Sequence, residues 1–184
     1  TQKPEKRPIR MESMRHDIEF RQSNRSADFI QGIEEEDSDD RFINRGRLLH
    51  TLFSAIETEE DIDSAIDRLV FEGVIRDDEK EGMVREVVQK AFSSPEIQDW
   101  YSGEWTLFSE CAIIYKEKGV LQTRRPDRVM MKENQVVVVD FKFGKENPKY
   151  NKQVKGYMQL LSKMGYENIT GYLWYVDEER IEKV

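Results

Sequence analysis

QVVVVDFKF, at residues 135–143, is the stretch that decides the fold. Four consecutive valines are typical of a β-strand that is buried on both faces inside a sheet. The preceding segment, residues 120–131, is also rich in β-branched and aliphatic side chains, and the polar residues KENQ (132–135) between the two segments indicate a turn. The sequence therefore predicts a hairpin whose second strand lies in the middle of a sheet.

Asp127 and Asp140 are equally distant from the centre of this turn. A regular hairpin with that centre places the two aspartates opposite each other on one face, with Cβ atoms about 5 Å apart. Like charges in that position are destabilising, so we expect a cation between them. Mg²⁺ is typically held by one or two carboxylates together with water and phosphate oxygens. Asp127 and Asp140 are therefore predicted to be metal ligands.

Lys142 lies two residues beyond Asp140, so strand alternation puts it on the same face, while Phe141 points into the packing on the other. Phosphodiester hydrolysis needs a metal ion to activate water and a positive group to orient it or to neutralise the developing charge. Two aspartates and a lysine supply both requirements. The alternative is a hairpin that carries only a surface ion pair, because the short pattern D-x-K is common.

Composition and charge narrow the class of protein. The 184 residues suffice for one globular domain, and the formal charge is −8. Residues 116–163 nevertheless carry twelve Lys/Arg against five Asp/Glu, a net of +7 that leaves −15 for the rest. Such a basic region suits a phosphate backbone, with a scattered solvated surface as the alternative. The single cysteine excludes an intrachain disulfide framework, and no apolar run approaches the ~20 residues of a membrane span.

The order of the elements is read from composition and periodicity. Residues 1–41 are polar, with an acidic run at 34–40, and are predicted to be a linker before a domain at 42–184; the first residue, Thr1, suggests a fragment of a longer protein. Apolar spacing predicts helices over 42–56, 61–72, 77–92, 95–100 and 148–164. β-branched and aromatic residues predict strands over 107–115, 120–131, 135–143 and 169–176. The expected fold is α/β (α+β), with a central mixed sheet flanked by helices and an N-terminal helical region.

Four motifs occur in a fixed order: GRLLH (46–50), RPDRV (125–129), VVDFKFG (138–144) and Gln153 with Tyr157. Together they resemble the PD-(D/E)XK nuclease signature in its RecB/AddA form, over about residues 42–177, which implies a restriction-endonuclease-like core. In one departure, Pro126 stands where relatives often carry a small residue. Because proline cannot donate to a ladder, we expect an edge or bulged strand there, which would weaken the hairpin register. QSNRS (22–26) and GYLWYV (171–176) look like C-terminal nuclease domains of UvrD/Rep-type helicases in Bacteroidetes.

The resemblance implies further residues of the site. His50 and the main-chain carbonyl of Phe141 would join Asp127 and Asp140 as metal ligands, and Glu110 matches an acidic position that lines the site in relatives. Imidazole is a softer ligand than Mg²⁺ usually prefers, so Mn²⁺ should be accepted as well. The alternatives are that His50 is merely packed or solvated, and that Glu110 is an exposed carboxylate on a strand.

Contacts to DNA are expected from the helix after the hairpin. Gln153 and Tyr157 are four residues apart and share a helix face, from which they can reach the metal site or a phosphate. The alternative is that Tyr157 is a core residue whose hydroxyl has a hydrogen-bond partner within the protein. Sequence-independent phosphate contacts are predicted for the cations that flank the site: Lys145, Lys149, Lys152 and Lys155, with Arg124, Arg125 and Arg128 as further candidates.

The resemblance also implies a wider role. It predicts a Mg²⁺-dependent, exonuclease-type domain of an ATP-dependent helicase–nuclease that repairs double-strand breaks, in the bacterial cytoplasm near the nucleoid and without membrane contact. ATP would bind only to covalently linked helicase domains outside this sequence, and a second helicase–nuclease subunit is a further expected partner. Branches with an iron–sulfur cluster need four cysteines, so no cluster is expected. The alternatives are an inactive DNA-binding or subunit-docking module and a free-standing restriction-like endonuclease.

Overall fold

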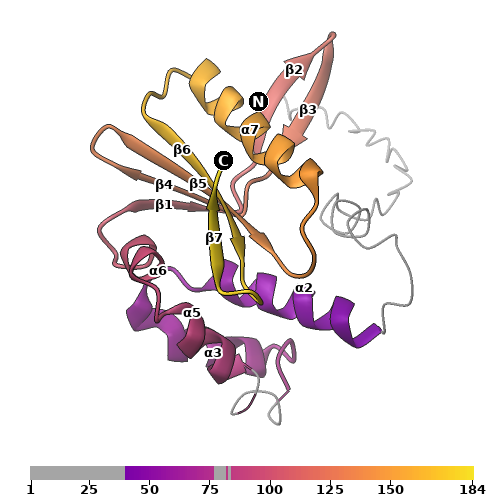
Figure 1. Cartoon of the computed structure of the whole chain (residues 1–184), viewed down its shortest axis with the longest axis vertical. Helices are drawn as coiled ribbons and strands as arrows, with labels where there is room; N and C mark the ends of the chain where they lie inside the picture. Colours follow the sequence, from indigo (N-terminus) through magenta and orange to yellow (C-terminus); the bar gives the residue numbers. More distant parts are fainter. Residues whose placement is uncertain (1–39, 77–81, 83) are drawn as a thin grey trace, which may run out of the picture. The chain divides into compact units, whose positions relative to one another are not determined.

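The computed structural model describes residues 40–76, 82 and 84–184, which belong to a unit that comprises residues 37–184. Five strands form its central sheet in the order β1-β4-β5-β6-β7, in which β5 and β6 are parallel and the other neighbours antiparallel (Figure 1). Their bounds are Thr106–Ser109, Arg128–Lys132, Gln135–Lys142, Ile169–Tyr175 and Arg180–Lys183. The predicted central mixed sheet is confirmed. The predicted linker falls outside the described residues, except that Asp40 and Arg41 already belong to the first helix.

Helices cover both faces of the sheet (Figure 1). The N-terminal group comprises α2 Asp40–Ala55, the 3₁₀ turn η1 Glu59–Asp61, α3 Ile62–Phe71, α5 Arg85–Ala91 and α6 Pro95–Trp100, and α7 Pro148–Lys163 follows β5. The helix predicted over 77–92 corresponds to α5 in its second half, and residues 77–81 and 83 of its first half lie outside the described residues. No helix in the described part of the chain is long and apolar enough to cross a membrane.

The alternation of side chains along β5 explains why helices pack on both faces of the sheet. Val137, Val139 and Phe141 are buried in the cluster that includes the N-terminal helices. Val136 and Val138 are buried on the opposite face, with Tyr157 and Leu161 of α7. A strand that is apolar on both faces is what a central position requires. The next residue of the second set is Asp140, so a carboxylate continues the row that faces α7.

The hairpin has the predicted centre. Arg128 pairs with Val139, and Lys132 pairs with Gln135 across a two-residue turn. One further step of this register puts Asp127 opposite Asp140. The expectation that Pro126 would make this an edge or bulged strand is wrong. β4 lies between β1 and β5 and begins at Arg128, so the proline precedes the ladder instead of interrupting it.

Two predicted strands are each divided in the structure. The span 107–115 breaks at Glu110, whose φ of 53° is left-handed and cannot continue a strand. The span 120–131 breaks at Pro126, which has no N–H to donate. Between the two breaks, β2 Ile113–Glu117 and β3 Val120–Arg124 pair only with each other as a separate two-stranded ribbon. The fifth strand of the sheet, β7, was not predicted.

Arg128 is a structural residue, and the prediction that it contacts phosphate is wrong. Its side chain is 1% exposed. The guanidinium donates to the main-chain carbonyls of Ile56, Glu57 and Trp100 at 2.8–3.1 Å and lies 3.7 Å from the centre of the Tyr101 ring. It therefore ties the start of β4 to the segment that follows α2 and to the last residue of α6.

We expect Arg128→Met to lower the free energy of unfolding by about 2–4 kcal/mol, because three buried carbonyls lose a charged donor. Urea denaturation followed by circular dichroism measures the change. Arg124→Met is the matched control, since Arg124 is exposed on β3, and it should change stability by less than about 0.5 kcal/mol. Equal effects of the two substitutions would contradict the buried role of Arg128.

A second stability prediction concerns Gly171 of β6, where α7 packs against the sheet. A Cβ atom at Gly171 would lie 2.5 Å from Cγ1 of Val154 and 2.6 Å from Sδ of Met158. Gly171→Ala should therefore cost about 1–3 kcal/mol through overpacking. Gly156 is the control, because a Cβ there meets nothing within 4 Å; Gly156→Ala within α7 should raise stability by about 0.5–1 kcal/mol. A Gly171→Ala protein as stable as the unsubstituted chain would refute this close packing.

Candidate active site

The predicted site residues meet at the end of the hairpin that is remote from its turn. Asp140 and Lys142 lie in the last part of β5. Asp127 immediately precedes β4, and Glu110 immediately follows β1. His50 comes from α2, 77 residues before Asp127 in the sequence. The structure therefore brings together all five side chains that the sequence predicts for catalysis and metal binding.

The carboxylate of Asp127 contacts two other elements. Its Oδ1 lies 2.8 Å from Nε2 of His50, and its Oδ2 accepts a 2.6 Å hydrogen bond from the main-chain N–H of Phe141. The Phe141 ring is buried and packs edge-on against the imidazole, with 5.9 Å between the ring centres. These contacts fix α2 to the end of β5 and orient the histidine towards the carboxylates.

Glu110 sits on the other side of the same histidine. Its Oε1 lies 3.6 Å from Nδ1 of His50 and accepts a 3.2 Å hydrogen bond from Oγ of Ser54. Its main-chain N–H donates to the carbonyl of Asp127 at 3.0 Å. The left-handed backbone turns this residue out of β1. Because 17% of the side chain is exposed, it is not the exposed strand carboxylate of the alternative interpretation.

Asp140 is the most deeply buried carboxylate of the site, with 2% of the residue exposed. Its Oδ2 lies 2.5 Å from Nζ of Lys142 and has no directed hydrogen bond among the described residues. Burial raises the pKa of Asp140 to about 6, with Asp127 adding to the effect and Lys142 opposing it. A buried acid held mainly by one ammonium group is unusual in a purely structural position.

Of the neighbouring groups, Asp127 has a lowered pKa, whereas His50 and Lys142 have raised pKa values. Burial alone would raise the pKa of Asp127, but the charge and hydrogen bond of His50, followed by Lys142, outweigh it and lower that pKa. Burial would likewise lower the pKa of His50 and of Lys142, yet the surrounding carboxylates raise both. The environment thus separates the two aspartates, as is common where two carboxylates have different chemical tasks.

Lys142 is held from the side of α7. Its Nζ donates to Oε1 of Gln153 at 3.1 Å and lies 4.2 Å from the centre of the Tyr150 ring. Gln153 in turn donates from Nε2 to the hydroxyl of Tyr157 at 2.8 Å. Tyr157 is 3% exposed within a hydrophobic cluster, as the alternative interpretation expected. Its hydroxyl also donates to the carbonyl of Arg125 at 3.4 Å.

Sequence reasoning missed Ser54, Tyr150 and the contact of Arg125, whose Nη1 lies 4.0 Å from Oε2 of Glu110. Helical spacing could have found the first two. Ser54 is four residues after His50 in α2, and Tyr150 is three residues before Gln153 in α7. Residues at these spacings share a helix face, so each was a neighbour of a residue already predicted. The predicted phosphate contacts Lys145, Lys149, Lys152 and Lys155 are all exposed, in the loop before α7 and in its first half.

The donor set suits a hard divalent cation, although the side chains are engaged with each other. Among the described residues, no three His, Cys, Asp or Glu side chains stand ready to hold a metal ion. His50 and Asp127 are bonded to each other, and Asp140 is paired with Lys142. Yet carboxylate oxygens are the ligands that Mg²⁺ or Mn²⁺ takes, one imidazole favours Mn²⁺ as the softer of the two, and the buried Oδ2 of Asp140 lacks a directed partner. The residues therefore fit such an ion once these contacts are exchanged.

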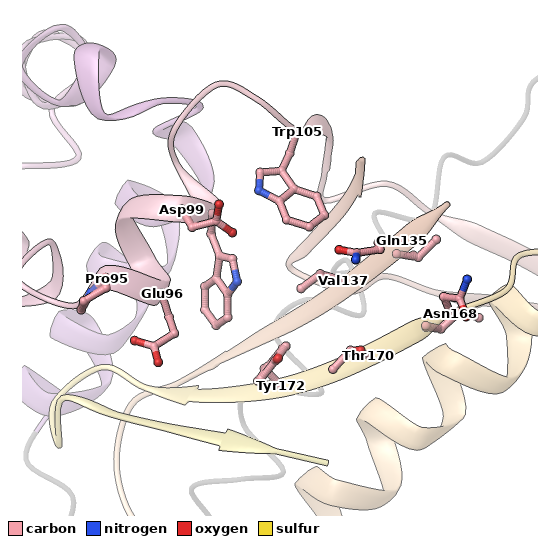
Figure 2. A pocket seen from close by; sticks show the side chains of 12 residues that line it. Pro95, Glu96, Asp99, Trp105, Gln135, Val137, Asn168, Thr170 and Tyr172 are labelled. Atoms are coloured by element: carbon pink, nitrogen blue, oxygen red, sulfur yellow. The ribbon is translucent and has the colours of Figure 1, made fainter. Parts of the chain in front are cut away.

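A cleft of about 740 Å³ lies elsewhere in the unit, at the start of β5 and β6 (Figure 2). Trp105, Asp99 and Glu96 line it across from Gln135 and Tyr172 of the sheet. None of the predicted site residues lines this cleft. Its two carboxylates would repel a phosphate, so the cleft is not a second candidate for phosphodiester chemistry.

Comparison with known proteins identifies the family. The family model described as PD-(D/E)XK nuclease superfamily matches residues 25–184, which is most of the chain. No curated protein matches the sequence. The match includes every predicted site residue, and the mixed sheet between helices agrees with the restriction-endonuclease-like fold. Members of this superfamily are nucleases that generally use divalent metal ions, and this chain belongs to the PD-(D/E)XK nuclease superfamily.

Proposed function

We propose that this chain hydrolyses phosphodiester bonds of DNA with Mg²⁺, and with Mn²⁺ as a substitute. The observation that carries the proposal is the convergence of Glu110, Asp127 and Asp140 around one histidine and one lysine. Buried carboxylates at this density are costly unless a cation is available to them. Family membership supports nuclease chemistry and a DNA substrate.

Asp127, Asp140, His50 and the main-chain carbonyl of Phe141 would hold the ion, with Glu110 lining the site. A divalent cation bound there activates water for attack and stabilises charge at the phosphorus. To hold the ion, Asp127 and His50 would give up their contact with each other. The hydrogen bond from the Phe141 N–H to Oδ2 of Asp127 holds this carboxylate independently of that contact.

Lys142 has a separate task in the proposal. Its ammonium group is directed by Oδ2 of Asp140, Oε1 of Gln153 and the Tyr150 ring. Gln153 and Tyr150 would keep the charge in position when Asp140 binds the ion, which is what orientation of an attacking water or neutralisation of a developing negative charge requires. Gln153 is thus a positioning residue for Lys142, in addition to any contact it makes to DNA.

The exposed lysines of the loop after β5 and of α7 supply the DNA contacts in this proposal. Lys145, Lys149 and Lys152 lie within ten residues of Lys142 in the sequence. They would bind phosphates regardless of sequence. Tyr157 contributes indirectly, because its buried hydroxyl supports Gln153.

The finer assignment rests on the order and identity of the four motifs. They favour the RecB/AddA form, that is, the exonuclease-type nuclease domain of a bacterial helicase–nuclease that repairs DNA breaks in the cytoplasm, near the nucleoid. Helicase domains in the same polypeptide would bind the ATP, and a second helicase–nuclease subunit would be the partner. The second candidate is an inactive DNA-binding or docking module, which the mutual pairing of His50 with Asp127 favours.

We expect Asp140→Asn, Asp127→Asn and Lys142→Met each to lower the rate of DNA cleavage roughly 100-fold or more. Linear single- and double-stranded DNA is incubated with the chain in Mg²⁺ or Mn²⁺, and the products are resolved on gels. Lys163→Met, at the exposed end of α7, is the control and should cut at the unsubstituted rate. Cleavage that survives Asp140→Asn would remove the proposed site. DNA binding without cleavage by the unsubstituted chain would establish the inactive module instead.

A further prediction separates the two roles of Gln153. If it positions Lys142, Gln153→Ala lowers kcat on the order of tenfold with little change in KM. If it only binds a phosphate, KM rises and kcat is retained. Steady-state cleavage of a fluorescent oligonucleotide distinguishes the outcomes. Gln159→Ala, at an exposed position of the same helix, serves as the control and should leave both constants unchanged.

A further inference from the structure

The β2–β3 ribbon is separate from the sheet, and both of its ends connect to residues of the candidate active site. Its two strands pair only with each other, and they extend away from the five-stranded sheet (Figure 1). β2 begins three residues after Glu110, and β3 ends three residues before Asp127. The hydrogen bond from Glu110 N–H to the carbonyl of Asp127 closes the base. Anything that extends from the catalytic carboxylates in this direction therefore meets the ribbon.

The ribbon has a fixed base and a defined turn. Ile113 is buried with Val129, Val138 and Tyr157, which anchors the first residue of β2. Lys118 and Gly119 at the tip have φ of 49° and 84°, the left-handed pair of a two-residue turn that matches the twist of a hairpin. An isolated two-stranded hairpin is marginally stable by itself, so the ribbon depends on this anchor or on a bound partner.

The surface of the ribbon combines cations with exposed aliphatic side chains. Residues 113–125 contain four Lys/Arg and one Glu, a net of +3 in a chain whose formal charge is −8. Ile114 is 67% exposed and Leu121 is 72% exposed. The register pairs Ile114 with Thr123 and Lys116 with Leu121, so both aliphatic side chains share one face with Lys116. That face is opposite to the one that carries the buried Ile113.

We infer that the ribbon is an arm that lies in a groove of duplex DNA next to the phosphate to be cut. The inference rests on the proposed nuclease function. A major groove about 12 Å wide accepts a two-stranded β-ribbon, and five-residue strands reach about 17 Å. Lys116, Lys118 and Arg124 contact phosphates on both sides of the groove. Ile114 and Leu121 contact base edges and thymine methyl groups without strict sequence preference.

The charge and the position of the ribbon favour DNA over a protein partner. Its cations match a polyphosphate, and its base is continuous with the residues that would bind the scissile group. Exposed aliphatic side chains on a basic element are expected where phosphates and bases are contacted together.

The test uses a ribbon shortened without loss of its anchor. Residues 114–123 are replaced by Asn-Gly, so that the paired residues Ile113 and Arg124 flank a two-residue turn. Binding is measured without divalent cation by fluorescence anisotropy, on a duplex with a short single-stranded end and on the single strand alone. We expect at least a tenfold loss of affinity for the duplex and less than a threefold loss for the single strand. Equal losses on both DNAs, or no loss, would overturn the inference.

Point variants keep the inference testable if the shortened chain does not fold. Lys116→Ala with Lys118→Ala should lower the slope of log affinity against log salt by about 2, which corresponds to two lost phosphate contacts. Ile114→Ser with Leu121→Ser should weaken duplex binding several-fold at an unchanged slope. Lys163→Ala with Met164→Ser, an exposed pair at the end of α7, is the matched control. Ribbon variants that bind duplex as the control does would refute the arm.

A small substrate separates failure of the arm from failure of the nuclease proposal. Bis(4-nitrophenyl) phosphate can reach the carboxylates without touching the ribbon. The ribbon variants should hydrolyse it at the unsubstituted rate in Mn²⁺, while Asp140→Asn should not. Loss of this activity in a folded ribbon variant would mean that the ribbon shapes the site itself, against the inference. Normal cleavage of duplex DNA by ribbon variants, with Asp140→Asn inactive, would reject the arm and leave the nuclease intact.

Discussion

The site depends on the hydrogen bonds made by Asp127. One oxygen meets His50 of α2 and the other accepts the N–H of Phe141 in β5, while the main chain of the same residue accepts from Glu110 after β1. Continuing the hairpin register puts Phe141 opposite Pro126, which has no N–H for a ladder. The ladder ends there. In a continued ladder the Phe141 N–H would donate to the Pro126 carbonyl, and the Asp127 side chain accepts it instead.

The part of the site that lies on the hairpin could be predicted from the sequence, because two strands and one turn obey local rules. Asp127 and Asp140 lie opposite each other as their spacing predicts, because the turn has two residues and no bulge intervenes. The place of His50 could not be derived in this way. It is 77 residues from Asp127, and its approach depends on how α2 packs against Phe141 and Trp174. Only the motif resemblance identified it.

The divisions of the strands were missed for a different reason. Residues 107–115 and 120–131 are dominated by side chains that favour extended structure, and periodicity does not register one residue with left-handed φ. Glu110 has no composition signal for a break. β7 was missed because three of its four residues are charged, so its pairing with β6 comes from an edge position where one face is solvated. The sequence therefore predicts the sheet's centre better than its margins.

Both missed breaks have one structural consequence. Glu110 and Asp127 are the residues at which the chain leaves and re-enters the sheet, and the ribbon is the segment between them. A side chain at such a point is released from strand alternation and can turn towards the end of β5, as both carboxylates do. The same geometry that detaches the ribbon therefore assembles the acidic cluster. The two ends of the ribbon lie within three residues of Glu110 and Asp127. A ligand that binds to the ribbon is therefore also positioned relative to these two carboxylates.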